Sequence, residues 1–157
     1  MVAKMEPVTA EALKPFGALI EAPEAPGLRN IYTDWLGSAR VDMTPRLHMN
    51  SVAPTSVPYA VSLLERHPYS AQIFIPLDVA QYLVVVAPSL LDGAPDLASV
   101  RVFVAPGNVG VVYGAGVWHA GATVLERQGS FAVLMWRNDS ADDEEFLTLI
   151  DSIQIIS

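Results

Sequence analysis

The chain contains no cysteine, which removes three kinds of chemistry at once. Disulfides, thiolate metal sites and cysteine nucleophiles all require that residue. Charged residues are also scarce, at 17% of 157 residues, and acidic side chains outnumber basic ones by 17 to 9. A formal net charge of -8 without a basic cluster repels phosphate backbones, so we expect no nucleic-acid partner.

Long hydrophobic runs are missing as well. No stretch reaches the ~18 apolar residues of a spanning helix, and the charged segment Met1–Glu6 leads into no signal-peptide core. We therefore expect no membrane partner and a cytoplasmic location. Hydrophobic residues nevertheless make up 52% of the chain, and its length is typical of one domain. The expectation is a single domain over residues 1–157.

Prolines and glycines divide the chain into short apolar segments. Tyr82–Ala87 is continuously apolar, which is typical of a strand buried on both faces. The other expected strands are 29–36, 46–52, 59–67, 71–77, 99–105 and 130–137, with further short strands around 110–123. Residues 144–150 fit a short helix or a strand, and 152–156 are expected on a sheet edge. This pattern indicates an all-β sandwich or barrel.

Helical signals are confined to the N-terminal region. Thr9 is a suitable N-cap for a short helix over Ala10–Lys14, which Pro15 and Gly17 end. The acidic run Asp139–Glu145 is interpreted as a solvated loop or a helix start.

Candidate site residues gather around two of the three histidines. His119 follows the glycine-rich turn Gly114–Gly116, and His67 ends a predicted strand on the same face as Glu65. With Gln72 from the next strand, these side chains would give a cavity one carboxylate, two imidazoles and an amide. Such a set suits either a divalent metal or proton transfer, and the residues leave that choice open. His48 is expected to be structural or exposed.

Other site types find no support in the sequence. The glycines near 114–116 lack the third glycine and the strand-to-helix context of a dinucleotide loop. There is also no P-loop, no HExxH and no serine in a nucleophile elbow. We therefore expect no nucleotide cofactor.

Two motifs resemble those of the ureidoglycolate lyase family, formerly called ureidoglycolate hydrolases. Glu65-Arg66-His67-Pro68 followed by Gln72-x-Phe74-x-Pro76 is similar to the family's central signature. The looser spacing of Gly110, Gly116 and His119 resembles the second motif of cupins. The resemblance extends over essentially the whole chain, because the order of the surrounding segments also fits.

The resemblance implies a cupin-type β-barrel (a double-stranded β-helix or jelly roll) with one or two short peripheral helices, and a homodimer. It further implies an amidine-lyase type of carbon–nitrogen lyase that cleaves ureidoglycolate to glyoxylate and urea in allantoin breakdown. His119 or His67 would transfer the proton, and Glu65 would orient or tune that group. We expect Gln72, Tyr113 and Asn50 to bind the small carboxylate substrate. His67, Gln72 and His119 are the expected ligands of a divalent metal, if one is used.

Four departures from the family pattern accompany the resemblance. Ala120-Gly121 stand where His-Pro is usual, and Gly114 replaces a polar residue. Ser51 and Ile31 stand at two positions that commonly hold arginine, the natural partner of a carboxylate. Two alternatives therefore accompany the lyase hypothesis: a cupin acting on another small carboxylic acid, and a non-catalytic cupin that binds a metabolite or metal.

Overall fold

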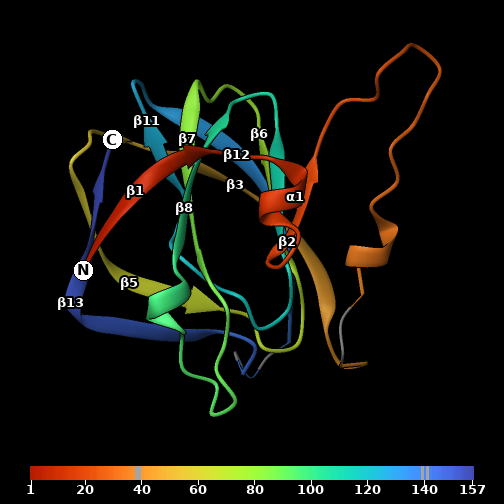
Figure 1. Ribbon diagram of the computed structural model, residues 1–157. Helices are drawn as coiled ribbons and strands as arrows, with labels where there is room; N and C mark the ends of the chain where they lie inside the picture. Colours follow the sequence, from red (N-terminus) through yellow and green to blue (C-terminus); the bar gives the residue numbers. More distant parts are fainter. Residues whose placement is uncertain (38–39, 139, 141) are drawn as a thin grey trace.

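The computed structural model describes residues 1–37, 40–138, 140 and 142–157, and these form two β-sheets packed face to face (Figure 1). The first sheet has the strand order β10-β5-β13-β1-β8-β7-β11-β4, and the second has the order β2-β9-β6-β12-β3. Their bounds are β1 Val2–Pro7, β2 Gly17–Ile20, β3 Thr44–Val52, β4 Pro54–Thr55, β5 Tyr59–Arg66, β6 Gln72–Pro76, β7 Gln81–Ala87, β8 Arg101–Pro106, β9 Gly110–Tyr113, β10 Trp118–His119, β11 Thr123–Leu125, β12 Gly129–Arg137 and β13 Glu145–Ile156.

The first sheet closes on itself because the short strand β10 pairs with β7 as well as with β5. Strand β7 consequently faces two separate cores. Val84 and Val86 pack with Phe74 and Phe131 of the second sheet, whereas Val85 packs inside the closed ring. The predicted burial of Tyr82–Ala87 on both faces is confirmed. The all-β barrel expected from the sequence is confirmed with it.

One predicted strand is wrong. Residues 29–36 contain no strand, only the 3-10 helix η1 (Thr33–Trp35). This segment has no neighbouring strand to pair with among the described residues, and side-chain hydrogen bonds fix its position instead. The Tyr32 hydroxyl accepts a hydrogen bond from the Glu21 amide at 2.9 Å, and the Asn30 amide donates to the Glu21 carbonyl at 3.0 Å. Figure 1 shows the preceding loop reaching away from the barrel.

The C-terminal region forms one strand rather than two elements. β13 runs from Glu145 to Ile156, with an irregularity in its pairing between Thr148 and Ile153. The expected edge position of 152–156 is also wrong, because β1 covers that side in parallel register. The polar residues of Val2–Pro7 give no strand signal in the sequence, so this partner of 152–156 was not expected.

Helical structure is slight, as predicted. The helix α1 spans Ala10–Leu13, and the Thr9 hydroxyl caps it by accepting from the Ala12 amide at 3.1 Å. A second 3-10 turn, η2, spans Leu97–Ser99. In the part of the chain that the structure describes, no helix has the length and apolar content needed to cross a membrane.

Candidate functional site

The site lies where the end of β5 meets β10. His119 pairs with Glu65 across these strands, and Gln72 at the start of β6 pairs with Tyr113 of β9. The turn that delivers His119 depends on Gly116, whose φ of +77° favours glycine. The Gly116 amide donates to the carbonyl of His67 at 2.7 Å, so the turn is fastened directly to the end of β5.

His119 is fully buried and is held on three sides. Its ring stacks on Tyr113 with centroids 4.2 Å apart, and its Nδ1 lies 3.0 Å from the carbonyl oxygen of Val117. A carbonyl can only accept, so Nδ1 carries the hydrogen.

The other ring nitrogen of His119 faces two oxygens. Nε2 lies 2.8 Å from Gln72 Oε1 and 3.3 Å from Glu65 Oε1. An unprotonated Nε2 would present a lone pair to two acceptors, which is unfavourable. A hydrogen or a bound cation at this nitrogen, or a Gln72 amide turned to donate its N–H, would relieve the contact with Gln72.

His67 is equally buried but has the opposite need. Its Nδ1 donates to the carbonyl oxygen of Asp143 at 2.7 Å, which leaves Nε2 as the bare nitrogen. Nε2 of His67 is buried and has no hydrogen-bond partner among the described residues. A buried acceptor without a partner is costly, and such atoms often belong to a site that a ligand completes.

Glu65, His67 and His119 converge as the sequence predicted. One ligand atom from each lies within 4.8 Å of the others, and the two imidazole centroids are 5.8 Å apart. Gln72 joins them through its contact with His119. The sequence expectation for a metal named Gln72 beside the two histidines, whereas the three-atom cluster contains Glu65.

The surroundings shift two pKa values in the cluster. Burial lowers the pKa of His67 below its ordinary value, and the neighbouring charge of His119 lowers it further. Burial acts to raise the pKa of Glu65, but the hydrogen bond and charge of His119 outweigh it and hold that pKa below its ordinary value. At neutral pH the site therefore offers a neutral imidazole beside an ionised carboxylate.

A cavity of about 310 Å³ is lined by Glu65 of this cluster and by Gln72, whereas His67 and His119 are not among its lining residues. Asn50 lines it, as expected for a substrate contact, and Tyr113 lies beneath His119. Gly121, one of the departures from the family pattern, also lines it, and a side chain there would meet nothing within 4 Å. This departure leaves open space at the cavity.

Three lining residues escaped the sequence analysis: His48, Arg137 and Glu144. His48 lines the cavity rather than being merely structural or exposed. Alternation along β12 could have found Arg137, because it continues the inward face of the buried Phe131, Val133 and Met135.

The expectation of a solvated loop holds for only part of the acidic run where the structure describes it, because Asp142 and Glu145 are exposed but Asp143 is buried. Asp139 and Ala141 lie outside the described residues, but each of the four residues 142–145 has a specific partner. Asp142 pairs with Arg40, Glu144 with Arg137 and Glu145 with Arg66.

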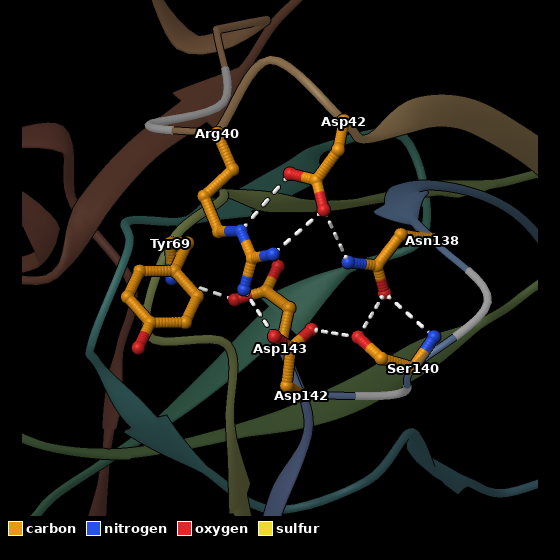
Figure 2. A network of polar contacts seen from close by, with 7 residues as sticks. All are labelled: Arg40, Asp42, Tyr69, Asn138, Ser140, Asp142 and Asp143. Carbon is orange, nitrogen blue, oxygen red and sulfur yellow. Dashed lines mark hydrogen bonds and ion pairs between the residues drawn. The ribbon is translucent and has the colours of Figure 1, made fainter.

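Asp143 is the fully buried member of this segment (Figure 2). Its carboxylate accepts hydrogen bonds from the Tyr69 amide at 2.6 Å and from the Ser70 hydroxyl, while its carbonyl holds His67. Figure 2 shows it beside a surface network that joins Arg40, Asp42, Asn138, Ser140 and Asp142. The acidic segment therefore supports the site from its outer side, by holding the ring of His67.

Comparison with known proteins agrees with the geometry. A sequence model of the ureidoglycolate lyase family matches residues 1–155. The ureidoglycolate lyase of Pseudomonas aeruginosa (strain LESB58) is 35% identical over 155 residues, covering 92% of this chain and 90% of the relative. That of Burkholderia mallei (strain NCTC 10229) is 36% identical over 138 residues, covering 83% and 79%. The chain belongs to the ureidoglycolate lyase family.

Proposed function

We propose that this protein is a ureidoglycolate lyase, which releases urea and glyoxylate from ureidoglycolate in allantoin breakdown in the cytoplasm. The observation that carries the proposal is the pair of buried imidazoles, His67 and His119, that converge on Glu65, a carboxylate that also lines the cavity. Family membership and the names of the relatives support the same substrate.

The reaction moves one proton from oxygen to nitrogen. The carbinol carbon of ureidoglycolate loses its bond to the urea nitrogen, whose electron pair leaves with that nitrogen, and the hydroxyl becomes the aldehyde of glyoxylate. His67 Nε2 is the bare, neutral nitrogen suited to accept the hydroxyl proton. His119 Nε2, which lies between Gln72 Oε1 and Glu65 Oε1, is placed to pass a proton to the departing urea.

Glu65, His67 and His119 could instead bind a divalent metal ion, which would give both Nε2 atoms a partner. Two imidazole nitrogens and a carboxylate suit a first-row divalent ion, and the unpartnered Nε2 of His67 has the chemistry of a ligand. Backbone carbonyls already hold both Nδ1 atoms, as is usual for metal-binding histidines. Such an ion would act as a Lewis acid toward a substrate oxygen.

A related small carboxylic acid is the second candidate substrate. The open space at Gly121 favours it, because the cavity would accept a larger group than urea there. A chain without catalysis would instead bind a metabolite at the same residues.

We also propose a homodimer formed through the outer face of the second sheet. Met49 of β3 and Ile75 of β6 flank Ala132 of β12, and Met49 and Ile75 are 63% and 42% exposed. Leu47, two residues before Met49, is 68% exposed. An apolar stripe of this kind, on and beside the edge strand β3, is typical of an interface.

Incubation with ureidoglycolate tests the function directly. Wild-type protein should form glyoxylate faster than the spontaneous reaction, and His67→Ala or His119→Ala should lower kcat by at least about 100-fold. Arg101→Gln, on the exposed part of β8, is the matched control and should leave kcat unchanged. No acceleration by the wild type, with or without divalent metal, would sink the proposal.

The pH profile tests His67 as the base. Because its pKa lies below the ordinary 6.5, His67 is neutral at pH 7 and becomes protonated only at lower pH. The value of kcat/KM should stay level on acidification to pH 6.5 and fall below it. An acidic limb centred above pH 6.5 would count against this assignment.

Thermal unfolding tests the metal without any assay of activity. A divalent ion at ~100 times its dissociation constant should raise Tm by roughly 5–10 °C. His67→Ala should abolish the shift and His48→Ala should keep it, since His48 is outside the three-atom cluster. An equal shift in His67→Ala, or metal-free protein that no ion stabilises, would contradict the metal proposal.

Sedimentation analysis tests the dimer. Wild-type protein should sediment as a dimer. The double variant Leu47→Glu, Met49→Glu should sediment as a monomer, because burying unpaired carboxylates in an apolar interface carries a large desolvation cost. Ile150→Glu, at a fully exposed position in β13, is the control and should remain dimeric. A wild-type monomer at assay concentration would refute the interface.

A further inference from the structure

The cavity holds one permanent positive charge. Among the described residues that line it, Arg137 is the only arginine or lysine. A guanidinium binds a carboxylate through two parallel hydrogen bonds, so Arg137 is suited to hold a carboxylate substrate. Arg137 also lines an outer recess of about 390 Å³, together with Thr44 and Arg46, so it lies between that recess and the cavity.

Arg137 is already occupied by a carboxylate from its own chain. Its Nη1 donates to Glu144 Oε2 at 2.8 Å and its Nη2 donates to Glu144 Oε1 at 2.5 Å, which is a two-point guanidinium–carboxylate pair. The two side chains are 20% and 22% exposed, so water and small solutes reach the pair. The charge of Arg137 also acts on Glu65, which places the pair within electrostatic reach of that carboxylate.

We propose that Arg137 is the substrate-carboxylate site and that Glu144 is an internal stand-in which the substrate displaces. The exchange replaces one carboxylate by another, so the guanidinium keeps two parallel hydrogen bonds throughout. Glu144 moves out to solvent, which its partial exposure allows.

Two other arginines near the site, Arg66 and Arg40, pair with different carboxylates. Arg66 pairs with Glu145 and lies over the Trp118 ring at 4.8 Å, on the strand face opposite Glu65. Arg40 pairs with Asp42 and Asp142 in the surface network of Figure 2. Neither residue lines the cavity.

Calorimetric titration with glycolate, an unreactive hydroxy acid, tests the inference without turnover. Glu144→Gln should lower the Kd of glycolate by about 10-fold, because an internal competitor is removed. Arg137→Gln should raise it by at least about 10-fold, with Arg137→Lys in between. Neutral glycolamide should bind equally to all three variants.

Matched controls separate a local effect from a structural one. Glu6→Gln removes the carboxylate from the exposed ion pair between Glu6 and Arg101, neither of which lines the cavity. This variant should leave the glycolate Kd unchanged. Arg137→Lys, with thermal unfolding as a check, keeps the test valid if Arg137→Gln does not fold. Unchanged or weaker glycolate binding in Glu144→Gln would overturn the exchange, and wild-type binding in Arg137→Gln would overturn the site.

The inference rests on the proposed function for the identity of the carboxylate only. Glycolate binding that follows these variants in a protein without lyase activity would uphold the carboxylate site and reject the lyase. If the protein has lyase activity and Arg137→Gln leaves the KM for ureidoglycolate unchanged, the lyase function is upheld and the carboxylate site at Arg137 is rejected.

Discussion

Two backbone carbonyls decide what the site can do. Val117 and Asp143 each accept a hydrogen bond from the Nδ1 of a buried imidazole, so His119 and His67 both turn Nε2 toward the shared cluster. The chemistry therefore depends on the path of the main chain in the glycine turn and in the acidic segment. A shift of either segment would misplace a nitrogen even if every side chain at the site were retained.

The charged residues of the acidic segment help to position the main chain beside the site. Residues 142–145 place four consecutive carboxylates against four different partners, and only Asp143 is fully buried. Exposed pairs of this kind contribute little to stability one by one. Together they fix the start of β13 beside β5, where the carbonyl of Asp143 meets His67.

Much of the barrel and the centre of the site follow from the sequence, because strand alternation is a local signal. It correctly placed Glu65 and His67 on a common face. The role of the acidic segment was not predictable in this way. Its partners lie between 7 and 102 residues away in the chain, and charge runs by themselves are typical of solvated surface. The loop over 29–36 was misread because its aromatic residues suit a strand, whereas its side-chain hydrogen bonds to Glu21 are invisible in sequence.

Strand β7 has a consequence for cooperativity. Its alternate residues belong to two different cores, one between the sheets and one inside the closed ring. If β7 leaves either core, its backbone moves, and the apolar side chains that it contributes to the other core become exposed as well. Partial unfolding that spares one core is therefore suppressed, and the two halves of the barrel should lose structure in one transition. His119 sits where the ring closes, because it pairs directly with β7, so the site should lose its geometry only when this shared strand unfolds.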